Sequence, residues 1–139
     1  ALPNVPCGPV GSLDCSKAEL VYLGFWTDKG TADQACLELL GRLRNKKIFL
    51  FGTAGFGGSE AYYQKILANV RTAIDASNTV VGEYMCQGRM PQAVRDRYVK
   101  MKEMPDAKPN LDALIENFDQ ALSHPDQEDL ERLRRMITG

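Results

Sequence analysis

Three short apolar segments, each followed by a stretch with helical periodicity, constrain the fold of this chain more than any other feature. Residues 20–26 form the first apolar run, residues 48–51 the second and residues 79–86 the third. Continuous apolar runs of this length are typical of strands that are buried on both faces of a parallel sheet. The order strand, helix, strand, helix, strand, helix predicts an α/β fold with a doubly wound parallel sheet and right-handed crossovers.

The segments that follow the strands have the apolar spacing of amphipathic helices. Thr31 and Gln34 have the spacing of a capping box, which predicts that the first helix begins there, and we expect it to end near Asn45. Ser59 is a candidate N-cap for the second helix. Further helices are expected over residues 93–102, 110–123 and 126–137.

We expect a single domain over residues 1–139, a length that can bury a core without disulfides or metals. Residues 1–19 are rich in proline and glycine and are expected to be irregular. Residues 20–104 would form the β/α core, and residues 105–139 the C-terminal helices.

Composition restricts the classes of function. The chain has 17 basic and 18 acidic residues, a net charge of −1 and no long run of either sign, so we expect neither nucleic acid nor a membrane as a partner. The four cysteines are scattered and the only histidine, His124, is expected to be solvated, so we expect no metal site and reduced thiols in a cytoplasmic protein. The chain also lacks the residue patterns of a hydrolase.

Two segments at the ends of predicted strands are unusual, and this is where open parallel sheets bind ligands. The only tryptophan, Trp26, ends the first strand, where its ring either covers the core or forms a flat wall against a planar ligand. Residues 52–58 contain four glycines, which indicates that something approaches the backbone closely. Their spacing is that of a P-loop, but a glycine stands where the phosphate-binding lysine is required, which argues against an NTPase.

The sequences GFWTDKGT at residues 24–31 and FGTAG at residues 51–55 resemble the flavodoxin family, and within it small bacterial flavodoxin-like proteins with a GFWxDKGT signature. The resemblance covers residues 18–137 and implies FMN at the strand ends, with the isoalloxazine ring between two loops. The residues that it implies are Trp26, Thr27, Asp28, Lys29 and Gly30 in the first loop and Thr53, Ala54, Gly55, Phe56, Gly57 and Gly58 in the second, with Phe56 as a second aromatic wall.

The resemblance also implies an FMN-dependent electron carrier that passes electrons to a partner oxidoreductase and tunes the flavin by stacking and hydrogen bonds. Two alternatives stay open: an FMN-dependent NAD(P)H reductase of a small acceptor, and a flavin-free flavodoxin-like binding domain. The family's first strand and its phosphate loop, of the type T/S-x-T-G-x-T, have no counterpart in these 139 residues. We therefore expect a sheet that lacks this strand, weakened FMN affinity, and a homodimer formed through the exposed sheet edge.

Overall fold

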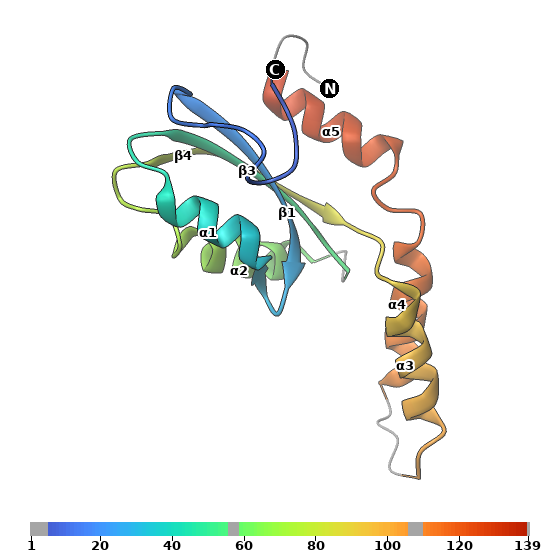
Figure 1. The fold of residues 1–139 in the computed structure, drawn as a ribbon. Coiled ribbons are helices and arrows are strands. Elements are labelled where there is room, and N and C mark those ends of the chain that lie inside the picture. Colours follow the sequence, from blue (N-terminus) through green and yellow to red (C-terminus); the bar gives the residue numbers. More distant parts are fainter. Residues whose placement is uncertain (1–5, 56–58, 106–109, 139) are drawn as a thin grey trace. The chain divides into compact units, whose positions relative to one another are not determined.

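The computed structural model describes residues 6–55, 59–105 and 110–138. It is an α/β structure with a mixed four-stranded sheet, and the alternation of strands and helices confirms the predicted fold class. The strands are β1 (Leu20–Asp28), β2 (Thr31–Ala32), β3 (Lys47–Ala54) and β4 (Thr79–Gln87), and the helices are α1 (Gln34–Arg42), α2 (Glu60–Arg71), α3 (Gln92–Lys102), α4 (Leu111–Ala121) and α5 (Gln127–Thr138) (Figure 1). None of the helices in the described ranges is both long and apolar enough to cross a bilayer.

The strands lie in the order β2-β1-β3-β4. At the start of the long strands, the amide of Lys47 donates to the carbonyl oxygen of Glu19 at 2.8 Å. At their other end, the amide of Gly88 donates to the carbonyl oxygen of Ala54, also at 2.8 Å. The first residues of neighbouring strands therefore lie beside each other, and so do the last residues. This arrangement shows that β1, β3 and β4 run parallel, as predicted.

The short strand β2 is antiparallel and was not predicted. It pairs with the end of β1, where Asp28 lies opposite Thr31. Between these two residues Lys29 and Gly30 have φ angles of 53° and 85°, the signs required by a two-residue type I′ hairpin turn. The capping box expected between Thr31 and Gln34 is therefore wrong, because Thr31 pairs in the hairpin and α1 begins at Gln34.

Helix α1 also ends earlier than expected. It ends at Arg42, because Leu43 has the extended angles φ −71° and ψ 139°. The predicted last residue, Asn45, has a φ of 58° and lies in the turn that leads into β3. The amide of Asn45 donates to the Ser77 hydroxyl at 3.0 Å, which fastens this turn.

Glycines and phenylalanines interlock β1 with β3. A Cβ atom on Gly24 would lie 2.6 Å from the ring of Phe51, so this ring occupies the space that a side chain at Gly24 would need. Phe25 covers Gly52 in the same way. Aromatic rings that cover glycines of a neighbouring strand fix the position of the two strands against each other. The core around them is made by Leu23, Leu40, Ile48, Leu50, Ile66 and Val70.

The chain divides into two compact units. The first comprises Ala1–Gly52 and Gln64–Tyr84, and the second comprises Thr53–Tyr63 and Met85–Gly139. The residues expected in the first flavin loop belong to the first unit, and those expected in the second loop belong to the second unit.

In the second unit, α3 and α4 lie side by side (Figure 1). The guanidinium of Arg95 donates to both carboxylate oxygens of Asp119, at 2.9 and 3.3 Å. The apolar side of α4 is anchored by Leu111, Phe118 and Ala121, each of which is at most 2% exposed. Burial of these three side chains stabilises α4 against the rest of the second unit.

Candidate functional site

The end of β1 and the turn after it contain the first group of residues expected to bind a flavin. Trp26, Thr27 and Asp28 are the last three residues of β1, and Lys29 and Gly30 form the turn to β2. The segment expected as a loop is thus a strand end that continues into a tight hairpin. Because a two-residue turn has little freedom, the five residues are held in one defined arrangement.

Trp26 presents its ring to solvent while its backbone is fixed. The residue is 58% exposed, so the indole does not cover the core. Its amide donates to the Asp33 carboxylate at 3.3 Å, and its carbonyl oxygen accepts from the Asp33 amide at 3.1 Å. A flat aromatic face is therefore available at the carboxyl end of a parallel strand.

Thr27 and the turn add polar groups beside this ring. The Thr27 hydroxyl oxygen is buried and has no hydrogen-bond partner among the described residues. Lys29 adopts a positive φ that residues other than glycine rarely adopt. Asn69 of α2 donates its side-chain amide to the Gly30 carbonyl oxygen at 2.8 Å and thereby holds the turn in place.

The second group of expected residues follows β3. Thr53 and Ala54 are the last residues of this strand, and Gly55 comes directly after it. The other expected residues of this group, Phe56, Gly57 and Gly58, lie outside the described residues. The prediction that Ser59 caps α2 is confirmed, because its hydroxyl oxygen accepts from the Tyr62 amide at 3.2 Å.

Two amide side chains that the sequence analysis did not single out converge on Gly55. Its carbonyl oxygen accepts from the side-chain nitrogen of Gln87 at 3.1 Å and from that of Asn117 at 3.0 Å. The Gln87 nitrogen also lies 3.3 Å from the Asn117 side-chain oxygen. A Cβ atom at Gly55 would lie 2.5 Å from the sulfur of Met90, so only glycine fits there without displacing this side chain. We call Gly55, Gln87 and Asn117 the Gly55 anchor.

In the strand order, β1 and β3 are neighbours. The structure brings together residues 26–30 within the first unit and, within the second unit, Thr53, Ala54 and Gly55, the described members of the second group. That the two groups contact the same flavin stays a prediction.

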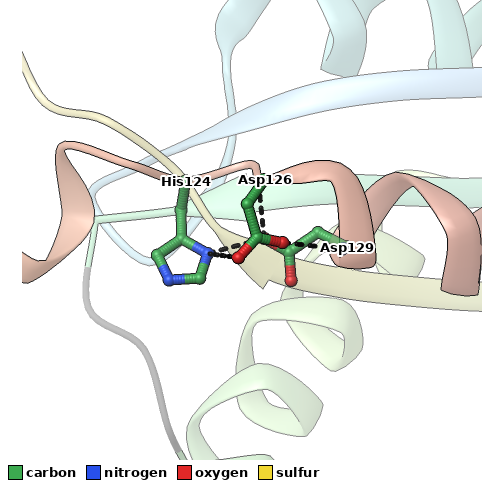
Figure 2. A group of neighbouring side chains, drawn as sticks. All are labelled: His124, Asp126 and Asp129. Carbon is green, nitrogen blue, oxygen red and sulfur yellow. Dashed lines mark hydrogen bonds and ion pairs between the residues drawn. The ribbon is translucent and has the colours of Figure 1, made fainter.

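A polar cluster lies at the N-terminus of α5 (Figure 2). The His124 Nδ1 atom lies 2.6 Å from a carboxylate oxygen of Asp129. The amide of Asp126 donates to Asp129 and the amide of Asp129 donates to Asp126, each at 2.9 Å. This reciprocal pattern is that of a capping box, with aspartate in the place of the usual glutamate. The expectation that His124 is solvated is wrong, because its side chain is 28% exposed and bonded to a buried carboxylate.

The potential ligand atoms of His124, Asp126 and Asp129 lie within 4.8 Å of one another, a grouping that their positions in the sequence did not reveal. In the described structure these atoms already bond to one another and to the backbone of the cap, so their arrangement is explained by the helix N-terminus.

Two buried cysteines are poor nucleophiles. Burial raises the pKa of the Cys36 thiol to about 12, and a hydrogen bond with Asp33 adds to the effect. Burial also raises the pKa of Cys86 to about 11, with a further contribution from the charges of Asp129 and Asp126. A raised pKa favours the protonated thiol near neutral pH, which lowers the reactivity of both cysteines.

Known proteins resemble this chain over nearly its whole length. A sequence model described as a flavodoxin domain matches residues 4–138. The flavodoxin-like domain-containing protein BilS of Clostridium symbiosum (strain WAL-14163) is 38% identical over 142 residues, an alignment that covers 96% of this chain and 75% of that protein. A protein of the same name from Clostridioides difficile (strain CD3) is 29% identical over 118 residues, which cover 85% of this chain and 67% of that protein.

Proposed function

Because this chain belongs to the flavodoxin domain family, we propose that it binds FMN at the ends of β1 and β3 and carries electrons to a partner oxidoreductase. Membership of the family supports a flavin-type ligand in general, and the residues at the end of β1 support a planar one. When bound, FMN supplies the oxidation–reduction chemistry, and the protein supplies binding, orientation and electrostatics.

The end of β1 is the observation that carries the proposal. The Trp26 ring is exposed at the edge of the sheet where parallel α/β proteins bind ligands. Beside it, the Thr27 hydroxyl is buried and has no hydrogen-bond partner in the part of the chain that the structure describes. Aromatic rings stack on planar ligands, and an unsatisfied polar group is expected where a ligand completes the hydrogen bonding. These groups fit an isoalloxazine ring, which combines flat faces with polar edges.

Other residues would keep this surface in shape. Asn69 holds the Gly30 carbonyl group and with it the turn that would contact the ring. The Gly55 anchor holds the backbone at the start of the second expected loop. In the described part of the candidate site we find no pair of side chains suited to acid–base or nucleophilic catalysis.

Fluorescence of Trp26 tests flavin binding directly, because it is the only tryptophan in the chain. We expect titration with FMN to quench its emission in a saturable manner with one flavin per chain. The variant Trp26→Ala should raise the Kd for FMN about 10-fold, measured by calorimetry, because it loses the stacking contact. N-acetyltryptophanamide controls for absorption by the free flavin. If neither quenching nor calorimetry shows saturable binding, the flavin proposal is wrong and a flavin-free binding domain is favoured.

Reduction of the FMN-loaded protein separates a carrier from a reductase. We expect photoreduced protein to pass its electrons to a one-electron acceptor such as cytochrome c. We expect no sustained oxidation of NADH or NADPH when the only electron acceptor added to the FMN-loaded protein is a small molecule. Turnover of either nicotinamide at a rate that saturates with its concentration would favour the reductase.

A further inference from the structure

We propose that Asp33 is a positioning residue for the proposed flavin site. Its carboxylate holds the Trp26 peptide group and thereby fixes the strand end that presents the indole ring. The inference rests on the proposed FMN site, and it extends this site to the junction between β2 and α1, which the sequence motifs do not include. All the residues that carry it belong to the first compact unit.

The register of the hairpin between β1 and β2 places Asp33 opposite Trp26. Thr27 pairs with Ala32, so the next pair of positions away from the turn is Trp26 and Asp33. The Asp33 amide donates to the Trp26 carbonyl oxygen at 3.1 Å. This is one of the two backbone hydrogen bonds that a hydrogen-bonded antiparallel pair exchanges.

The second hydrogen bond of this pair is made by a side chain. The Asp33 carbonyl oxygen, which would accept it in a regular hairpin, accepts from the Leu37 amide at 3.1 Å and so begins α1. The Trp26 amide donates instead to the Asp33 carboxylate at 3.3 Å. The carboxylate thus substitutes for the backbone acceptor that the hairpin loses where the chain turns into a helix. Both polar backbone groups of Trp26 are therefore held by one residue.

The Asp33 side chain does not perform the usual task of an aspartate at its position. An N-cap aspartate normally accepts a hydrogen bond from a backbone amide of the first helical turn. Asp33 is the N-cap residue of α1, but within the described structure its side chain makes no such bond. Asp33 is only 9% exposed, and a buried carboxylate is costly unless it is hydrogen-bonded. The bond to the Trp26 amide therefore accounts for an acidic residue at this buried position.

A fixed strand end favours binding of a ligand at Trp26. The residue is 58% exposed, so the position of its ring depends largely on the backbone that carries it. Ordering a binding group before the ligand arrives lowers the entropy that binding must overcome. Asp33 therefore supports flavin binding through Trp26.

The variant Asp33→Ala tests this role, because it removes the acceptor of the Trp26 amide. We expect this amide to exchange with solvent deuterium at least about 10-fold faster in the flavin-free protein. We also expect the Kd for FMN to rise about 10-fold. Asp33→Asn keeps an oxygen acceptor on a side chain of the same shape, so it should restore both quantities to within about 2-fold of the wild type.

The matched control is Asp75→Ala. The Asp75 carboxylate also accepts from a backbone amide, that of Ser77 at 3.0 Å, in the turn that precedes β4. We expect this control to lose stability while exchange at Trp26 and the Kd for FMN stay those of the wild type. If Asp33→Ala does not fold, Asp33→Ser retains a favourable N-cap residue without the carboxylate, and the same comparison applies.

The outcomes separate this inference from the function on which it rests. If Asp33→Ala leaves either exchange at Trp26 or the Kd at the wild-type value, the positioning role is overturned. It is likewise overturned if Asp75→Ala changes both quantities as strongly, because the effect then reflects a general loss of stability, or if Asp33→Asn fails to restore them. If the wild type binds no FMN, the proposed function fails, and exchange at Trp26 alone decides whether Asp33 holds this strand end.

Discussion

Thr27 carries a hydroxyl oxygen that is buried without a hydrogen-bond partner in the described part of the chain. Such a group costs about 1–3 kcal/mol of folding free energy relative to a satisfied one. Its neighbour Trp26 exposes an indole ring to water. A buried hydroxyl without a described partner, next to an exposed aromatic ring, is an arrangement that a planar ligand with polar edges would complete.

Replacement of this hydroxyl by a methyl group separates folding from binding. We expect Thr27→Val to raise the free energy of unfolding of the flavin-free protein by about 1 kcal/mol, because it removes an unsatisfied polar atom at nearly constant volume. We expect the same variant to bind FMN less tightly. Urea unfolding and FMN titration measure the two effects.

Thr72→Val is a control that should change the free energy of unfolding in the opposite direction. The Thr72 hydroxyl donates to the Asn69 carbonyl oxygen at 2.6 Å, so its removal should destabilise the protein. If Thr27→Val destabilises as much as Thr72→Val does, the Thr27 hydroxyl is satisfied in solution and the argument for a ligand at this position fails.

Helix α5 depends on the cap formed by His124, Asp126 and Asp129 (Figure 2). Burial alone would raise the pKa of Asp129, but the hydrogen bonds from His124 and from the Asp126 amide outweigh it and hold this pKa below its ordinary value. The charged carboxylate is therefore more favourable in the folded than in the unfolded state. Its stabilising contribution is complete above about pH 4, where the unfolded carboxyl is ionised, and it is lost as the pH falls through the lower folded pKa.

The variant Asp129→Asn should consequently destabilise the protein by about 1 kcal/mol at pH 7, the usual cost of losing a cap. The difference from the wild type should shrink below about pH 4, as the wild-type carboxylate becomes protonated. Glu128→Gln is the matched control, because Glu128 forms an exposed ion pair with Arg132 that contributes little. Urea unfolding at several pH values measures the difference in the free energy of unfolding between Asp129→Asn and the wild type. A difference that stays constant down to pH 3 would contradict the role of the Asp129 carboxylate in the cap.

Elements with a strong local pattern could be predicted from the sequence. The third apolar run, expected over residues 79–86, is the strand Thr79–Gln87, and the helix expected over residues 93–102 is Gln92–Lys102. Strand β2 was missed because Lys29 occupies a turn position that usually requires asparagine or glycine. Local propensity does not show that the hairpin with β1 would prevail over a helix start at Thr31.

Only those residues of the candidate site that stand close together in the sequence could be predicted. Trp26 and the glycines stand out in the sequence as single unusual residues. The Gly55 anchor does not, because Gln87 is 32 positions and Asn117 62 positions away from Gly55. Amides at these distances look like ordinary polar residues until the fold brings them to one carbonyl oxygen, so a single sequence offers no signal for them.

At the scale of the whole molecule, the order of the described strands gives β1 a long neighbour on one side only. On the other side the two-residue β2 pairs with Thr27 and Asp28, at the end of β1. Residues 20–26 contain no charged side chain that would discourage pairing with a further strand. The net charge of −1 adds little repulsion between copies of the chain.

A second copy of the chain is the partner that we expect at this edge. Light scattering after gel filtration should show a dimer whose fraction rises with protein concentration. Leu20→Lys introduces a charge at a 38% exposed position of β1 and should shift the equilibrium toward monomer, because an edge lysine opposes strand pairing. Val81→Lys makes the same kind of change at a 49% exposed position of β4 and should leave the dimer intact. A wild type that stays monomeric at all concentrations contradicts the expectation, and a dimer that only Val81→Lys dissociates would place the interface on β4.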